Sequence, residues 1–272
     1  MIQGITNSLY KFIPVIKRAR GYRLYDNNGK RYIDLYQQNG HALLGHRAFS
    51  LTTILKNIIS KGLIFDLPSI YASRLIKAVK ELIPGIQSVF IAGSIEQGLK
   101  SLSAIGEMSL SQHDIYDPFL ENKRGKIAVW RPFSGITYED EQILLPILPF
   151  SMGGSPIVIC FRKKLMNLES VPLLSPFILA GTVRAVYDLN KYIFPEWFNN
   201  NLLKNTGKWD QRGLYIIPKM EEKEYEVEFK RFLSKGVLLS PHYPQPSILP
   251  AELSSGELQN LLQLFNRELN IK

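Results

Sequence analysis

The chain has 272 residues, of which 45% are hydrophobic and 21% charged, and its formal net charge is +9. A chain of this length can bury a core without disulfides, in one large domain or two modest ones. Cys160 is the only cysteine, which excludes an internal disulfide and fits a reducing, cytoplasmic setting. The basic residues are scattered and never alternate with aromatics in a block, and no apolar run approaches ~18 residues, so we expect no nucleic-acid binding and no membrane span.

The first third of the chain predicts an arm, a hairpin and two helices. Residues 1–20 read as an amphipathic arm with a basic end. Residues 21–35 predict a β-hairpin, because apolar residues alternate on both sides of an Asp-Asn-Asn-Gly turn that supplies positive φ. Apolar residues at helical spacing predict helices over 48–62 and 71–82, and Pro84-Gly85 ends the second helix.

The middle of the chain predicts an α/β sheet. Residues 88–92 form a short apolar run typical of a buried strand, and a glycine, a serine and a further helix follow it. This strand–loop–helix order is a βα unit. Two more buried strands are expected at 127–130 and 157–161, and a helix is expected at 177–192.

A polar, turn-rich stretch at 199–207 precedes a different pattern. Strands alternate there with helices in an α+β order, which indicates a smaller C-terminal domain. The expected elements are a strand at 213–217, a helix at 222–235, a strand at 236–240 and a helix at 255–269. We therefore predict an arm and hairpin at 1–47 that belong to the small domain, a large α/β domain at 48–198 and a C-terminal α+β domain at 199–272.

Several segments carry a recognisable pattern in a fixed order. The hairpin and the turn after it contain Gly21, Leu24, Asp26, Gly29, Tyr32, Ile33 and Asp34, then Gly40 and Leu44-Gly45-His46. Three further segments, 82–97, 152–159 and 229–264, follow in the same order. Together they resemble class III aminotransferases that depend on pyridoxal phosphate, and most of all the glutamate-1-semialdehyde 2,1-aminomutases, in a shortened and degenerate form.

The resemblance implies a fold-type I α/β architecture. Its parts are an N-terminal arm, a large domain with a reduced and mostly parallel sheet, and a small C-terminal α+β domain. It also implies a homodimer, because active sites in the family form between two subunits.

The residues that the family reaction needs are absent at the matching positions. The lysine that holds the cofactor falls on Pro149, and the aspartate that pairs with the ring nitrogen falls on Trp130, or on Arg131 if the gap shifts by one. A threonine that reaches the phosphate from the partner subunit falls on Val171. Only 36 positions separate Ser94 from Trp130, so the segment that carries the ring-stacking aromatic is missing.

The phosphate loop survives in part as Gly93-Ser94-Ile95-Glu96, at the start of a helix, and we treat these residues as a remnant anion site. Among the four histidines only His41 and His46 are close in sequence, and a packing role is expected for them, so we predict no metal site.

These observations favour a degenerate homologue without catalytic residues and without a cofactor, which acts as a binding or partner subunit. Its partner would be a second copy of itself, a full-length aminotransferase homologue or a small anionic ligand. The alternative is an active transaminase or aminomutase that binds pyridoxal phosphate through a displaced lysine, either Lys126 or Lys163.

Overall fold

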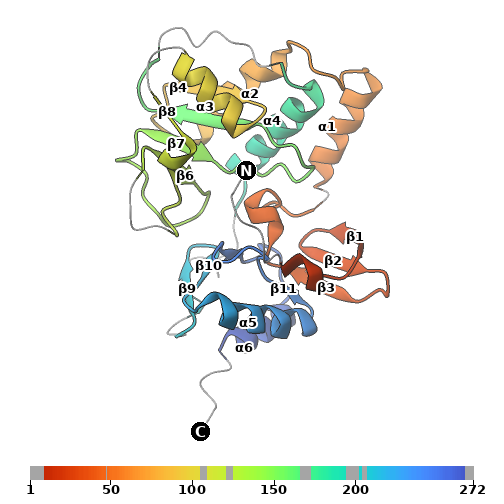
Figure 1. Cartoon of the computed structure of the whole chain (residues 1–272). Helices are drawn as coiled ribbons and strands as arrows, with labels where there is room; N and C mark the ends of the chain where they lie inside the picture. The colour runs from red at the N-terminus through yellow and green to blue at the C-terminus, as the bar shows by residue number, and fades with distance from the viewer. Residues whose placement is uncertain are drawn as a thin grey trace. The chain divides into compact units, whose positions relative to one another are not determined.

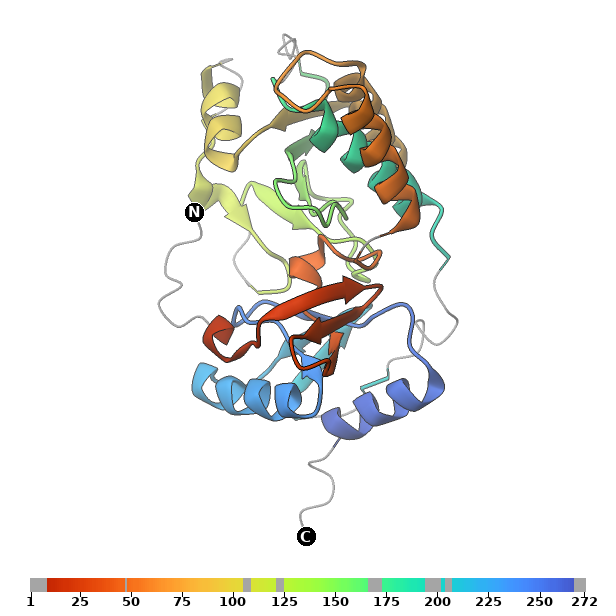
Figure 2. The same cartoon turned by 90° about the vertical axis from the view of Figure 1, so that its right-hand side faces the viewer.

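A computed structural model describes residues 9–46, 48–104, 109–120, 125–165, 173–193, 202–203 and 207–266. The chain forms two compact units, coloured along the chain in Figures 1 and 2. Unit 1 consists of Met1–Arg47, Phe133–Ile136 and Ile193–Lys272, and unit 2 of Ala48–Pro132 and Thr137–Tyr192. The predicted domain limits at 47/48 and 198/199 stay predictions.

Unit 2 contains a five-stranded sheet in the order β4-β8-β7-β6-β5. The strands are β4 (Ser88–Ala92), β5 (Ile115–Tyr116), β6 (Ile127–Trp130), β7 (Ile143–Pro146) and β8 (Ile157–Phe161). β5, β6 and β7 are parallel, whereas β8 is antiparallel to both of its neighbours, β7 and β4. The expected α/β class is confirmed. The sheet, expected to be mostly parallel, has four strands in one direction but is mixed, because β8 runs against its two neighbours.

The helices of unit 2 follow the predicted apolar spacing. They are α1 (Phe49–Ser60), α2 (Ile70–Leu82), α3 (Ile95–Ala104) and α4 (Pro176–Asn190). α4 packs against both α1 and α2, and the three lie side by side in Figures 1 and 2. Phe150, in the segment after β7, approaches α4 closely at Gly181, where an added Cβ would lie 2.5 Å from Cε2 of Phe150.

The strands of unit 2 are mostly apolar and mostly buried, as in other sheets covered by helices. Every residue of β4 is buried. α3 packs on β4 and β8, and its apolar face joins one core cluster with the strands. The buried members of that cluster are Phe90, Ala92, Leu99, Leu102, Leu110, Ile127, Ile143, Ile159, Phe161 and Leu165.

Unit 1 contains two small sheets. One has the order β1-β2-β3-β11 and is built from β1 (Ile16–Arg20), β2 (Arg23–Asp26), β3 (Arg31–Asp34) and β11 (Val237–Leu238). The other has the order β12-β10-β9 and is built from β9 (Trp209–Arg212), β10 (Tyr215–Pro218) and β12 (Ser247–Ile248). Helices α5 (Glu222–Ser234) and α6 (Ser255–Phe265) lie on one side of the strands of unit 1 in Figure 2.

The predicted hairpin is confirmed, because β2 and β3 pair antiparallel and Gly29 has a φ of 80°. Within the segment expected to be an arm over residues 1–20, Leu9–Phe12 form a short 3-10 helix and Ile16–Arg20 form strand β1 paired with β2, while residues 1–8 lie outside the described part of the chain. The basic side chains of β1 remain exposed at the edge of the sheet, where charge discourages further strand pairing.

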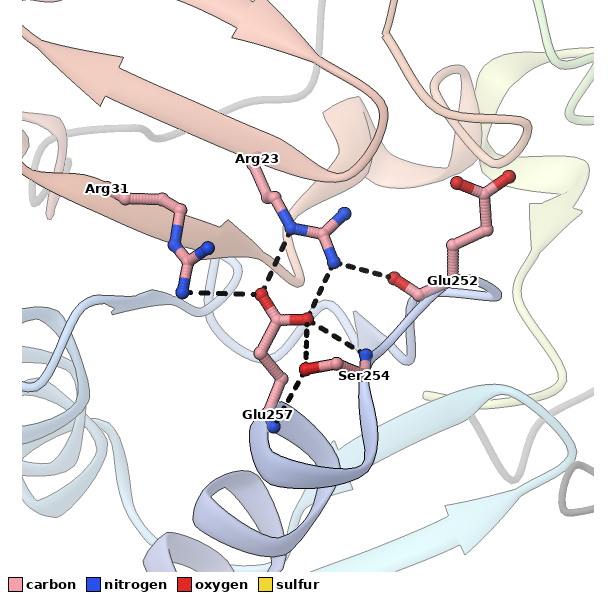
Figure 3. A network of polar contacts seen from close by, with 5 residues as sticks. All are labelled: Arg23, Arg31, Glu252, Ser254 and Glu257. Carbon is pink, nitrogen blue, oxygen red and sulfur yellow. Dashed lines mark hydrogen bonds and ion pairs between the residues drawn. The ribbon is translucent and has the colours of Figure 1, made fainter.

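A polar network fastens α6 to the hairpin (Figure 3). Arg23 donates from Nε to Oε1 of Glu257 at 3.0 Å and from Nη2 to Oε2 at 2.6 Å. Ser254 and Glu257 form a capping box at the start of α6, in which Glu257 accepts from the backbone N–H and the hydroxyl of Ser254. The Arg23 guanidinium thus binds a carboxylate that the helix terminus already orients.

Candidate functional site at the carboxyl edge of the sheet

The carboxyl ends of β4, β5, β6 and β7 meet at one edge of the unit 2 sheet. The register places Ala92 opposite Ile157 and Trp130 opposite Pro146, so the start of the reversed strand β8 lies at this edge too. Open α/β sheets bind their ligands outside the carboxyl ends of the strands. We therefore treat the loops at this edge as the candidate site.

The loop after β4 keeps the shape of an anion site but uses its hydroxyl internally. Ser94 Oγ accepts from the backbone N–H of Gln97 at 3.2 Å, and the Ser94 carbonyl accepts from Gly98 N at 3.0 Å. Ser94 therefore acts as the N-cap of α3. Gly93, Ser94 and Glu96 are exposed, and Glu96 brings a carboxylate into the first turn of the helix.

The half-buried side chain of Ile95 packs against the core cluster of the sheet, so Ile95 can offer an anion only its backbone N–H. The Ser94 hydroxyl already caps α3, and the Glu96 carboxylate repels an anion at the helix start. The anion site predicted at Gly93–Glu96 stays a prediction.

Neither of the two positions expected for an acidic partner of the ring nitrogen, Trp130 and Arg131, carries an acid. Arg131, directly after β6, is 3% exposed and pairs with Asp117, directly after the parallel neighbour β5, whose side chain is 9% exposed. Arg131 Nη2 donates to Asp117 Oδ2 at 2.5 Å and Arg131 Nε donates to the same oxygen at 3.1 Å. Trp130 is half-buried, and its carbonyl accepts from Ile147 N at 3.0 Å.

Neighbouring groups fix the orientation of this ion pair. Asp117 Oδ1 accepts from the backbone N–H of Phe119 at 3.0 Å, and the Arg131 guanidinium carbon lies 5.7 Å from the Phe119 ring centroid. The backbone N–H of Arg131 donates to the Tyr138 hydroxyl at 3.3 Å. Both carboxylate oxygens of Asp117 therefore have donors, which a buried charge requires.

Sequence reasoning missed Asp117. A two-residue strand leaves no periodic signal, although an aspartate before a proline is typical of a chain turning out of a strand.

Pro149 lies in the segment between β7 and β8 and is buried. The next residue, Phe150, packs with Leu51 and Leu55 of α1 in a small apolar cluster. The segment therefore supplies packing between the sheet and the helices and offers no amine.

The two lysines of the alternative hypothesis lie at the opposite edge of the sheet. The register places Ile127 opposite Ile143 and Ile143 opposite Phe161, so the start of β6 and the end of β8 share that edge. Lys126 directly precedes β6 and its Nζ lies 3.1 Å from Asp114 Oδ1, while Lys163 follows β8. A strand of four or five residues spans roughly 13–17 Å, which separates both amines from the candidate site.

Pyridoxal phosphate does not fit the described residues of this edge. The cofactor needs a lysine amine, an acidic partner for its ring nitrogen and a free phosphate loop. The edge offers Pro149, a buried guanidinium at Arg131 and a serine engaged as a helix cap. The sequence from 127 to 162 contains no lysine.

The remaining candidates are structural or lie elsewhere. His46 Nε2 contacts Asp34 Oδ2 at 2.7 Å in unit 1, a pairing that supports the expected packing role. Among the described residues, no group of three or more His, Cys, Asp or Glu side chains is placed to hold a metal ion. No helix in the part of the chain that the structure describes is long and apolar enough to cross a membrane. Val171 lies outside the described residues.

Comparisons with known proteins agree with the fold and leave the chemistry open. No model of a protein family matches the chain. An uncharacterized protein of Borreliella burgdorferi is 29% identical over 255 residues, which cover 93% of this chain and 90% of that protein. A glutamate-1-semialdehyde 2,1-aminomutase of Rhodopirellula baltica is 34% identical over 79 residues, which are 29% of this chain and 18% of the enzyme.

The fold itself is that of solved aminotransferases. An ornithine aminotransferase of Plasmodium yoelii superposes with a TM-score of 0.67 at 13% identity, over 93% of this chain and 92% of that chain. The similarity to the Borreliella burgdorferi protein covers nearly all of both chains, so the short form is not peculiar to this sequence. The chain therefore has the fold-type I architecture of the class III aminotransferases in a shortened form, and part of its sequence is similar to the glutamate-1-semialdehyde aminomutases.

Proposed function

We propose that this protein is a degenerate aminotransferase homologue that performs no chemistry dependent on pyridoxal phosphate and acts as a binding or partner subunit. The observation that carries the proposal is the buried Asp117–Arg131 pair at the carboxyl edge of the sheet. A guanidinium has five N–H donors and no acceptor, so Arg131 cannot accept the proton of a pyridinium nitrogen. Pro149 removes the amine that would anchor the aldehyde.

The alternative is an active enzyme with a displaced lysine. It requires Lys126 or Lys163 to cross from one edge of the sheet to the other, although Lys126 is already paired with Asp114. This geometry favours the degenerate homologue.

Reaction of the purified protein with pyridoxal phosphate, followed by borohydride reduction and peptide mapping, tests the proposal. We expect no yellow adduct on any single lysine and only the weak labelling of exposed amines that the heat-unfolded protein also shows. One stoichiometric adduct on a single lysine would refute the proposal. K126A and K163A identify the displaced lysine in that case, and K164A, an exposed neighbour, is the matched control.

The proposed partner is a second copy of the chain, bound through an apolar patch of unit 2. This patch consists of Ile64, Phe65, Leu67, Ile70 and Leu173, whose side chains are between 37% and 65% exposed. Two contacts bring its parts together, because Leu67 forms a bridge with Leu174 and the Ser175 hydroxyl donates to the Ile64 carbonyl at 2.8 Å. Contiguous exposed apolar residues mark protein interfaces, and a two-fold axis buries such a patch against itself.

Light scattering across a concentration series tests the partner. The wild-type protein is expected to be a dimer, and F65K is expected to be a monomer with an unchanged circular dichroism spectrum. V227K, which alters an equally exposed apolar residue of α5, is the control and should stay dimeric. A wild-type monomer at every concentration would exclude the second copy and leave the full-length homologue, to be tested as a defined two-protein mixture.

A cytoplasmic location belongs to the same proposal. Cys160 is buried within β8 and is a free thiol, as a reducing compartment allows.

A further inference from the structure

Two tyrosines and a histidine of unit 1 bring their polar atoms together at one point. The Tyr10 hydroxyl lies 2.6 Å from the Tyr36 hydroxyl and 3.0 Å from His242 Nε2, and the Tyr36 hydroxyl lies 3.3 Å from the same nitrogen. The residues come from three separate segments, which are the 3-10 helix at Leu9–Phe12, the turn after β3 and the loop after β11. All three belong to unit 1, so this cluster is distinct from the candidate site at the sheet edge of unit 2.

The spacing of these three atoms is close to that of ligands around a metal ion. With bonds of about 2.0–2.1 Å, neighbouring ligands are about 2.8–3.0 Å apart on an octahedral ion and about 3.3–3.4 Å apart on a tetrahedral ion. The observed separations are 2.6, 3.0 and 3.3 Å. An ion can therefore contact all three atoms from one side, so that they form one face of its coordination shell and water or a chelating anion completes the other.

The surrounding structure holds the three side chains in place. Their rings pack edge to face or tilted, with centroids 6.2, 5.2 and 5.6 Å apart. The backbone N–H of Tyr36 donates to Oδ1 of the buried Asp34 at 2.9 Å, and the backbone N–H of His242 donates to Oγ of the buried Ser240 at 3.3 Å. Because the donor atoms are already gathered, an ion that binds them orders few additional groups.

We infer that Tyr10, Tyr36 and His242 form a metal site for a hard, highly charged cation, which we identify as ferric iron. Phenolate oxygens are hard anionic ligands, imidazole suits iron, and tyrosine is an iron ligand in some haem proteins. The three residues include no thiolate for a soft ion and no carboxylate for calcium or magnesium. Binding replaces the phenolic protons, which pass to water. Tyr10 is 43% exposed, so an ion can reach the cluster from solvent.

Titration of the full chain with ferric nitrilotriacetate, followed by desalting, tests the site. We expect a visible absorption band from phenolate-to-iron charge transfer, which saturates at one iron per chain and survives desalting. Y10F/Y36F should lose this band, whereas Y25F, which alters a half-buried phenol of β2, should keep it. H242Q should keep the band but weaken iron binding by more than about tenfold, because even groups that only support metal ligands contribute that much.

The absence of a band at one equivalent of iron would overturn the inference, and so would a band that persists in Y10F/Y36F or is lost equally in Y25F. Absorbance that rises without saturation and disappears on desalting would mean adventitious iron only, which also overturns it. Circular dichroism shows whether each variant is folded. If Y10F/Y36F is unfolded, the single variant Y10F decides, and an unchanged band in Y10F overturns the inference. None of these outcomes depends on pyridoxal phosphate or on a partner, so the site and the proposed function fail separately.

Discussion

Glu257 is expected to make unit 1 sensitive to acid. The hydrogen bonds from Arg23, together with those from Ser254, hold the pKa of Glu257 at about 2 against an ordinary value of 4.5, although burial opposes this shift. The Glu257 side chain is only 9% exposed, whereas Arg31, the second arginine near it, is 54% exposed and adds little. E257Q keeps the shape of the side chain and removes its charge.

The magnitude follows from the two pKa values. Each tenfold change in an acid dissociation constant corresponds to about 1.4 kcal/mol, so Glu257 contributes at most about 3 kcal/mol to the free energy of unfolding. Because the folded pKa is the lower one, this contribution is complete above about pH 4.5 and is lost as the pH falls towards 2. At about pH 3 the contribution of Glu257 to the free energy of unfolding should be roughly half of its full value or smaller.

Urea denaturation of the wild-type protein and E257Q at pH 7, 5 and 3 measures this contribution. Trp209 of unit 1 is a local reporter, because its ring centroid lies 5.3 Å from that of Phe265 on α6. With Trp130 and Trp197 replaced by phenylalanine, its fluorescence follows the packing of unit 1 around Trp209, which also contacts Tyr225 and Phe232 of α5. We expect E257Q to lose about 2–3 kcal/mol at pH 7 and less than half of that at pH 3. An equal loss at both pH values would refute the electrostatic explanation.

Three further predictions concern buried positions. G181A should lower the Tm by several degrees, because its new Cβ meets the ring of Phe150 at 2.5 Å and overpacking destabilises a core. Y225F should lower the free energy of unfolding by about 1–2 kcal/mol in urea titrations, because the Tyr225 hydroxyl donates to the buried Ser240 carbonyl at 2.6 Å. Cys160 should react with a thiol reagent only after unfolding, because burial raises the pKa of its thiol to about 12.

Matched controls separate these effects from general loss of stability. G207A adds a Cβ that meets no atom within 4 Å, so it should leave the Tm unchanged. Tyr10 is 43% exposed and its hydroxyl also forms a hydrogen bond, with the Tyr36 hydroxyl at 2.6 Å, so Y10F should have a smaller effect than Y225F, whose hydroxyl is buried. Rapid labelling of Cys160 in the folded protein would contradict its burial within β8.

The sequence predicted best those elements whose local signals agree with their burial. The helix expected at 71–82 is confirmed as α2, and the strand at 88–92 is β4 with the predicted bounds. The helix has a clear apolar period and the strand a short apolar run, and each has a turn at its boundary. The hairpin was predicted from its Asp-Asn-Asn-Gly turn, and Gly29 adopts the positive φ that this turn requires.

The elements that were missed lack such signals. β7 was not predicted because prolines interrupt its apolar run, yet Pro146 is tolerated at the last position of the strand. β9 is polar and packs its tryptophan and glutamine inward. Asp117 and Arg131 are 14 positions apart and directly follow two neighbouring strands, and no periodicity of the sequence predicts that they form an ion pair.

The reversed direction of β8 has a consequence for how this protein can change over time. It places Lys163 at the edge of the sheet away from Arg131, and Lys126 lies at that same edge, so neither of these two lysines reaches the candidate site by a small shift of a loop. A Schiff base at this edge would require a new lysine near Pro149 and also the removal of Arg131, and the second change alone leaves the Asp117 carboxylate without its buried partner. The two substitutions would therefore have to occur together, because removal of Arg131 alone leaves a buried charge uncompensated.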